Sequence, residues 1–313
     1  MILACGDSLI DFVTRDSEGH TVYEPYPGGS VLNFAVAIGR LGSSVGFMGG
    51  VSADFFGDMI LTHLSASGVD VRFVTRQAAG TTLAFAQIKE GKSRYAFFDE
   101  NSAMRNWLFN PEALGSQLPT AVHVGSIALI DPGAFTQAMA LIAATRSGAV
   151  ISLDPNCRPS LVVDEDDYRA RIGAMMACCD IVKLSDEDLA YLHPGLSPDQ
   201  FAEDCMSNGA SIVALTRGAD GAIIWCRAGH VEIMAAPCEV RDTIGAGDSF
   251  HGALLHALDQ MGLLGKSWLE SIGRDELERA GRFAATAAAI TCSRDGANPP
   301  RAEEVRAQAG SLL

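Results

Sequence analysis

The nine residues Asp242–Phe250 (DTIGAGDSF) carry the pattern that decides the fold and the chemistry predicted for this chain. Small residues fill the middle of the stretch, and an apolar stripe of helical period (Phe250, Leu254, Leu258) follows it. Small residues let the backbone approach a ligand closely, and the free N–H groups that open a helix attract an anion.

A helix is predicted to begin near Asp248, so a carboxylate stands at this anion-attracting position. It would repel a bound phosphate, but it would also hold an adjacent hydroxyl and accept its proton. The spacing alone supports two interpretations equally. One is a phosphoryl-transfer site, and the other is a helix N-cap in a glycine-rich loop.

Elsewhere in the chain, short apolar runs alternate with segments of helical period. One such helical segment is Val31–Leu41, which ends at Gly42. The runs are bounded by turn residues, as expected for strands that are buried on both faces. These predicted strands are Ile2–Cys5, Val45–Met48, Ala121–Val124, Val150–Leu153, Ile181–Leu184 and Ser211–Leu215. The alternation predicts a doubly wound, mostly parallel α/β sheet with helices on both faces.

Two regions depart from this alternation and predict extra strands. Residues 12–26 read as a strand pair, and residues 81–98 read as a second pair that turns at residues 90–92. We expect a small β-strand lid from about 12–26 and 81–105 within a single domain spanning 1–313. The sequence leaves the oligomeric state open, but exposed strand edges favour a homodimer formed through the lid.

Composition and charge exclude several classes of partner. The 23 basic and 38 acidic residues give a net charge of −15 with no basic run, which argues against nucleic acid and anionic membrane surfaces. The N-terminus lacks a basic, apolar leader pattern, and no apolar stretch is long enough to span a membrane. The eight cysteines are scattered without a CxxC pair, which indicates free thiols in a reducing cytoplasm.

The stretch DTIGAGDSF resembles the C-terminal motif, D-T-x-G-A-G-D-x-F, of the ribokinase-like (PfkB-type) carbohydrate kinases. The resemblance implies a kinase that uses ATP and Mg²⁺ to phosphorylate a sugar. It also implies that Asp248 is the catalytic base and that the amides of Gly245, Ala246 and Gly247 form the anion hole.

A second motif lies near the N-terminus. Residues 28–37 (GGSVLNFAVA) resemble the family segment G-G-x-x-x-N-x-A, which implies that Gly28, Gly29 and Asn33 contact the sugar. Asp11 aligns with the family's acceptor for a sugar hydroxyl. Asp7 follows the first predicted strand and is either a second contact or a turn residue.

Further segments keep the family order, so the resemblance covers nearly the whole chain. Residues 154–161 (DPNCRPSL) resemble a segment of the fructokinase-like branch, which implies a substrate contact from Arg158. The other segments imply contacts to the nucleotide and to a monovalent cation such as K⁺. The nucleotide residues are Lys183, Ser185, Thr216, Gly218, Gly221 and Asn298, and the cation residues are Asp242 and Gly296.

Two departures from the family pattern matter. The metal-associated N-x-x-E motif reads Ser185-x-x-Asp188 here, and either Glu187 or Asp188 is expected to order Mg²⁺ through water. In the lid, Phe98 and Arg105 are expected at the sugar, but the acids Asp99 and Glu100 stand between them. These acids either face the site and disfavour an anionic substrate, or form a solvated turn.

The function predicted is an ATP-dependent kinase that transfers the γ-phosphoryl group to a sugar hydroxyl, most similar to the fructokinases. A 2-keto-3-deoxygluconate kinase and a ribose or nucleoside kinase are the alternatives within the family. An alternative of another class is a non-catalytic regulator that binds a sugar or nucleotide on the same fold.

Overall fold

A mostly parallel sheet forms the body of the chain, whose computed structural model describes residues 1–89, 92–115 and 118–310. The strand order is β14-β13-β12-β11-β10-β9-β1-β4-β5, and β6 pairs with β4. The strands are β1 (Ile2–Cys5), β4 (Val45–Ser52), β5 (Val69–Asp70), β6 (Val74–Gln77), β9 (Ala121–Gly125), β10 (Val150–Asp154), β11 (Ile181–Ser185), β12 (Ile212–Thr216), β13 (Ala222–Cys226) and β14 (Gly229–Ile233). All six predicted body strands are confirmed, whereas the antiparallel edge pair β13–β14 was not predicted.

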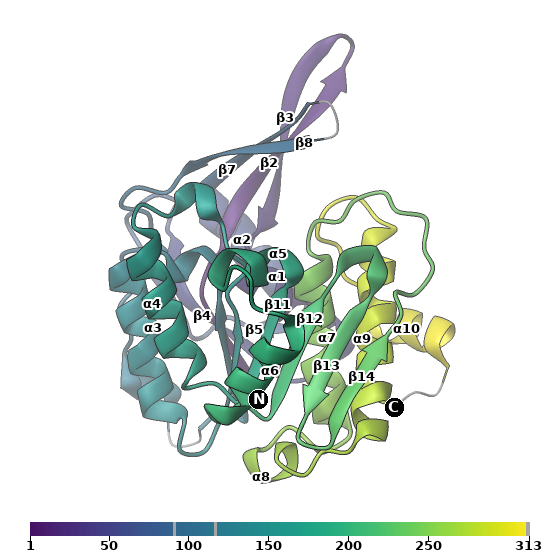
Figure 1. The fold of residues 1–313 in the computed structure, drawn as a ribbon. Coiled ribbons are helices and arrows are strands. Elements are labelled where there is room, and N and C mark those ends of the chain that lie inside the picture. The colour runs from purple at the N-terminus through teal and green to yellow at the C-terminus, as the bar shows by residue number, and fades with distance from the viewer. Residues whose placement is uncertain (90–91, 116–117, 311–313) are drawn as a thin grey trace.

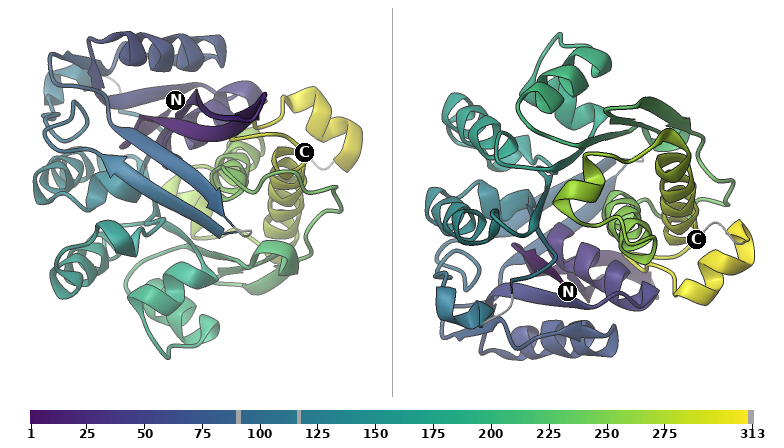
Figure 2. Two further views of the ribbon diagram at one scale, coloured as in Figure 1. Left: turned by 90° about the horizontal axis from the view of Figure 1, so that it is seen from above. Right: turned by 90° about the horizontal axis from the view of Figure 1, so that it is seen from below.

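Helices cover both faces of this sheet, as Figure 2 shows from above and below. They are α1 (Ser30–Leu41), α2 (Phe55–Ala66), α3 (Pro132–Thr145), α4 (Glu165–Met176), α5 (Asp186–Leu192), α6 (Pro198–Ser207), α7 (Ala246–Gln260), α8 (Lys266–Leu269), α9 (Arg274–Cys292) and α10 (Ala302–Ala309). One apolar core packs α1, α2, α7 and α9 against one face of the sheet. A second core packs α3, α4, α5 and α6 against the other face. In β1, Ile2 and Ala4 enter the first core while Leu3 and Cys5 enter the second, so the strand is buried on both faces. The doubly wound prediction is confirmed.

The predicted lid is a separate sheet that rises above one edge of the body (Figure 1). Its order is β3-β2-β7-β8, with β2 (Leu9–Ser17), β3 (His20–Gly28), β7 (Leu83–Lys89) and β8 (Lys92–Phe98). The pair β2–β7 is parallel and the outer pairs are antiparallel. Two residues of the predicted turn, 90 and 91, lie outside the described residues.

Two further observations concern the chain as a whole. None of its described helices combines the length and apolar character needed to cross a bilayer. The eight cysteines carry no disulfide and are free thiols.

Candidate active site

A cavity of about 810 Å³ lies between the lid and the carboxyl edge of the parallel strands. Asp11 and Phe97 line it from the lid, and Lys183, Thr216 and Asp248 line it from the body. Parallel α/β sheets bind ligands at this edge, because the loops that follow the strands meet there. The volume falls within the range of about 300–1,000 Å³ typical of small-molecule sites.

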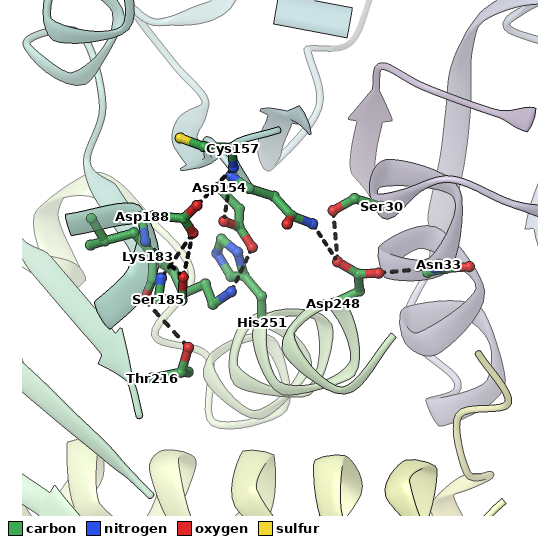
Figure 3. A network of polar contacts seen from close by, with 12 residues as sticks. Ser30, Asn33, Asp154, Cys157, Lys183, Ser185, Asp188, Thr216, Asp248 and His251 are labelled. Atoms are coloured by element: carbon green, nitrogen blue, oxygen red, sulfur yellow. Dashed lines mark hydrogen bonds and ion pairs between the residues drawn. The ribbon is translucent and has the colours of Figure 1, made fainter. Parts of the chain in front are cut away.

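Asp248 is a buried acid of this cavity, in the first turn of α7. Its Oδ1 accepts a hydrogen bond from Ser30 Oγ at 2.6 Å, and its Oδ2 accepts one from Asn33 Nδ2 at 2.9 Å (Figure 3). Burial raises the pKa of Asp248 to about 6, although the bonds from Ser30 and Asn33 lower it. A carboxyl group with a pKa near the working pH is well suited to accept a proton.

The start of α7 decides between the two interpretations of this turn. The helix begins at Ala246, two residues earlier than predicted, and Gly245 is the residue at the N-cap, with no side-chain cap. The Asp248 carboxylate bonds the side chains of α1 instead. Asp248 is therefore not a helix cap, and its carboxylate remains at the cavity.

The turn before α7 brings free backbone amides to the same place. Gly245 has φ 76°, and a Cβ there would lie only 2.7 Å from Ala297 Cβ, so the position requires glycine. Within the described chain, the amides of Gly247 and Asp248 have no acceptor. Of the predicted anion-hole amides, that of Ala246 already donates to the Thr243 carbonyl at 3.2 Å.

The sugar-side residues of the sequence motifs meet beside Asp248. Asp11 lines the cavity, and its carboxylate has no hydrogen-bond donor among the described residues. Burial and the nearby charge of Asp7 raise the pKa of Asp11 to about 7, whereas Arg158 lowers it. Gly28 lies behind Asp11, because a Cβ there would be 2.1 Å from Asp11 Oδ2.

Asp7 supports the start of α1. Its carboxylate accepts hydrogen bonds from the amides of Ser30 at 3.1 Å and Val31 at 2.9 Å. Gly29, with φ 107°, allows this approach, because a Cβ there would lie 2.9 Å from the Asp7 carbonyl oxygen. Asp7 therefore has a structural role at this turn, and it also lines the cavity.

The lid places a different aromatic side chain at the cavity from the one predicted. Phe97 lines the cavity, whereas Phe98 is 62% exposed and contacts Phe85, with ring centroids 5.5 Å apart. Successive side chains of a strand point to opposite faces, so only one of these two rings can face the sugar side. The structure therefore places Phe97, and not Phe98, at this cavity.

Arg105 is also placed differently from the prediction. Its Nε donates to Asp99 Oδ2 at 2.6 Å, and its NH1 lies 3.5 Å from Asp131 Oδ2. Asp99 is buried and also accepts from the hydroxyls of Thr82 and Ser102. Arg105, Asp99 and Glu100 do not line the cavity, and Arg105 is instead held by Asp99 and Asp131.

The nucleotide-side residues of the sequence line the other end of the cavity, with one exception. Lys183, Ser185, Thr216, Gly218 and Gly221 belong to this wall. Asn298 does not, because its Oδ1 accepts from Arg40 NH1 at 2.6 Å at the end of α1.

Two acids in the first turn of α5, which follows β11, were candidates for Mg²⁺. Asp188 is buried, and its oxygens accept from the Cys157 amide at 2.7 Å and from Ser185 Oγ at 2.8 Å. Glu187 is exposed and lines the cavity, and within the described chain its carboxylate accepts no such hydrogen bond. The described residues contain no cluster of three or more metal-binding side chains. This donor set fits Mg²⁺ held through water and substrate phosphates, which needs only one or two carboxylates.

The two segments expected at a monovalent cation are adjacent in space. The Gly296 amide donates to Asp242 Oδ2 at 3.0 Å, and the Ile244 amide donates to Oδ1 at 3.0 Å. The backbone amides of Arg241 and Asp242 also donate to the Cys292 carbonyl. Asp242 thus joins the turn before α7 to the chain after α9, although neither Asp242 nor Gly296 lines the cavity.

Three residues of the site were missed by the sequence analysis as functional positions. Ser30 and Asn156 contact the Asp248 carboxylate, the latter at 3.4 Å, and Asp154 binds Lys183 at 2.7 Å. All three lie inside motifs that had been identified, GGSVLN and DPNCRPSL. Arg158, which was predicted, lines the cavity and donates to Asn156 Oδ1 at 2.6 Å.

Comparison with known proteins agrees with this geometry. Residues 1–304 match the family model described as pfkB family carbohydrate kinase. A fructokinase of Rhizobium leguminosarum bv. trifolii is 37% identical over 279 residues, which cover 88% of this chain and 85% of the relative.

Solved structures give the same result. A fructokinase of Xylella fastidiosa with bound ATP superposes with a TM-score of 0.90 at 25% identity, over 98% of this chain and 97% of the other. A double mutant of the Vibrio cholerae O395 fructokinase, bound to fructose, ADP and a potassium ion, gives a TM-score of 0.85 at 26% identity, also over 98% and 97%.

Proposed function

Because this chain belongs to the pfkB family of carbohydrate kinases and is a phosphotransferase, we propose that it transfers the γ-phosphoryl group of ATP to a hydroxyl of fructose. The observation that carries the proposal is the Asp248 carboxylate. It is buried, held by Ser30 and Asn33, and set beside the free amides that open α7.

In this proposal, Asp248 accepts the proton of the attacking hydroxyl. Ser30 and Asn33 fix the carboxylate in one orientation, and Asp11 on the facing lid strand accepts a second sugar hydroxyl. The free amides of Gly247 and Asp248 stabilise the charge that develops on the transferred group. Phe97 covers the sugar from the lid and excludes water, which would otherwise compete for the phosphoryl group.

The charges at the sugar end favour a neutral substrate. Asp7, Asp11 and Asp248 line this end, and Arg158 is a cation beside them. The charge of Lys183 is paired with the buried Asp154. Arg105, a further cation expected from the sequence, is neutralised by Asp99 and Asp131. A sugar acid such as ketodeoxygluconate would meet this excess of negative charge, whereas fructose would not. The Rhizobium and Xylella relatives are named fructokinases, which agrees with that choice.

The nucleotide is proposed to lie along Lys183, Ser185, Thr216 and the Gly218–Gly221 turn. Mg²⁺ would neutralise phosphate charge, with Glu187 as the residue that orders its water, because the Asp188 oxygens are already engaged. A potassium ion would be held by backbone carbonyls of the two segments that Asp242 joins.

We further propose a homodimer formed through the lid. The lid face that points away from the cavity carries a row of aromatic rings, of which Tyr23 is 45% and Phe98 62% exposed. The lid also ends in the strand edges β3 and β8. A partner that covers these features would remove both apolar surface and unpaired backbone groups from water. We also propose a cytoplasmic location, which the free thiols and the proposed ATP substrate support.

A screen of sugars tests the substrate. ADP release is measured with Mg²⁺, K⁺ and ATP over fructose, ribose, ketodeoxygluconate, tagatose and adenosine, and we expect the highest kcat/KM for fructose. Preference for ketodeoxygluconate would contradict the charge argument. Tight binding of a sugar by calorimetry without ADP release from any of the five would instead favour a non-catalytic regulator.

A further inference from the structure

A buried ion pair joins Lys183, which lines the cavity, to Asp154 behind it. Asp154 is the last residue of β10, and Lys183 lies near the end of the adjacent parallel strand β11. Lys183 Nζ and Asp154 Oδ2 are 2.7 Å apart, and the two side chains are only 4% and 2% exposed (Figure 3). Burying both charges is costly, and an apolar pair of similar volume often stabilises a protein as well or better. The pair therefore calls for an explanation other than stability.

The ammonium group of this pair faces the start of α7. A Cβ built on Gly247 would lie 3.0 Å from Lys183 Nζ, so the cation sits directly against the turn whose amides of Gly247 and Asp248 are free. Lys183 lines the cavity, whereas Asp154 does not. A positive charge and two free N–H groups thus converge on one point beside the Asp248 carboxylate.

The acids around Lys183 keep its side chain charged. His123 and His251 are the histidines buried nearby, and burial together with the Lys183 charge lowers the pKa of both, that of His123 to about 3. Burial also lowers the pKa of Lys183, but Asp154, Asp188 and Asp248 outweigh burial and raise the pKa overall. The side chain is therefore an ammonium ion beside neutral imidazoles.

The ammonium group also has unused donors. It carries three N–H bonds. Within the part of the chain that the structure describes, the one acceptor of Nζ is Asp154 Oδ2. The remaining N–H bonds are left for a ligand in the cavity.

We propose that Lys183 is a catalytic residue that contacts the transferred γ-phosphoryl group, and that Asp154 is the positioning residue that aims it there. This inference rests on the proposed function. During transfer the sugar oxygen bonds to the γ-phosphorus, the bond from that phosphorus to the β,γ-bridging oxygen breaks, and the hydroxyl proton passes to Asp248. Lys183 exchanges no proton, and its charge stabilises the non-bridging oxygens.

The test compares the single variants Lys183→Met and Asp154→Asn with the double variant that carries both changes. Either single change leaves one buried charge unpaired, so we expect both to lower the Tm markedly. The double variant leaves no unpaired charge, so its Tm returns towards that of the wild type. Its kcat should stay about 10²–10³-fold low, as in Lys183→Met, because the cation is still missing.

A binding measurement separates contact with the phosphoryl group from a structural role. Calorimetry measures the affinity of the double variant for adenylyl imidodiphosphate, a triphosphate analogue, and for ADP. We expect the loss of affinity, relative to the wild type, to be at least tenfold larger for the triphosphate analogue than for ADP. Lys266→Met is the matched control, because Lys266 pairs with Asp180 at 2.6 Å outside the cavity. It should leave kcat and the affinity ratio unchanged.

Two outcomes would overturn the inference. One is a double variant whose kcat lies within threefold of the wild type, and the other is an equal loss of affinity for both nucleotides. If a single variant does not fold, the double variant still gives a result, because it leaves no buried charge unpaired. A wild-type protein that releases no ADP with any sugar would overturn the proposed function, whereas an active wild type with an equally active double variant would overturn only this inference.

Discussion

The chemistry of this kinase depends on carboxylates whose environments differ. Asp248 is enclosed and hydrogen-bonded by α1, whereas Asp11 has no donor and faces the cavity. Burial raises the pKa of each, to about 6 for Asp248 and about 7 for Asp11. Asp7 and Asp154, close by, are engaged with backbone amides or with Lys183. These four aspartates therefore take different roles because their neighbouring groups differ.

These pKa values predict the pH dependence of the reaction. A base accepts a proton only when it is deprotonated, so kcat/KM for fructose should fall as the pH drops below about 7 and fall more steeply below about 6. Rates measured from pH 5 to 8 at saturating MgATP check this. Asp11→Asn should weaken fructose binding and leave a single ionisation near pH 6. An unchanged profile in that variant would contradict the assignment of Asp11.

At the scale of single elements, the turn before α7 is tightly constrained. Gly245 adopts φ 76° against Ala297, and Asp242 joins the same turn to Gly296. Both constraints tie the DTIGAGD turn to the distant segment after α9, and both hold the amides that the reaction requires. The geometry of the anion site is therefore built before any ligand arrives.

Gly245→Ala tests that constraint. We expect a loss of about 2–4 kcal/mol in the free energy of unfolding, from the left-handed backbone and the overlap with Ala297 Cβ, together with a lower kcat. Gly262→Ala is the matched control, because its φ is 70° but no atom lies within 4 Å of the added Cβ. It should cost about 1 kcal/mol and leave kcat unchanged. Equal effects in denaturant unfolding would show that the contact with Ala297 is unimportant.

The sequence predicted these elements well where a local pattern carried the information. Apolar runs located the strands of the parallel sheet, and motif order located Asp248, Asn33 and Asp11. The failures involve partners distant in sequence. Asn298 is held by Arg40 from another helix, and the choice between Phe97 and Phe98 depends on which face of β8 meets the cavity. Local patterns do not contain those contacts.

At the scale of the whole molecule, the lid has two faces with different consequences. One face, with Asp11 and Phe97, closes the sugar end of the cavity. The opposite face exposes aromatic rings to solvent and has no partner within the described chain for much of that surface. Substrate enclosure and the proposed dimer would therefore be linked through one thin sheet.

Phe98→Ser tests the proposed dimer. Removing this 62%-exposed ring should shift the mass measured by sedimentation from dimer towards monomer at micromolar concentration, with little change in Tm. Trp268→Ser is the control, because Trp268 is similarly exposed, at 59%, but lies on α8 at the far end of the body (Figure 1). A wild-type protein that sediments as a monomer would contradict the proposal.

The central claim is that Asp248 is the base for phosphoryl transfer. The most direct test is kcat of Asp248→Asn with saturating fructose and MgATP, beside Asp259→Asn on the same helix, whose carboxylate bonds Ser43 outside the cavity. We predict that kcat falls about 10²–10⁴-fold in Asp248→Asn and is unchanged in Asp259→Asn. A kcat near that of the wild type in a folded Asp248→Asn variant would contradict the account.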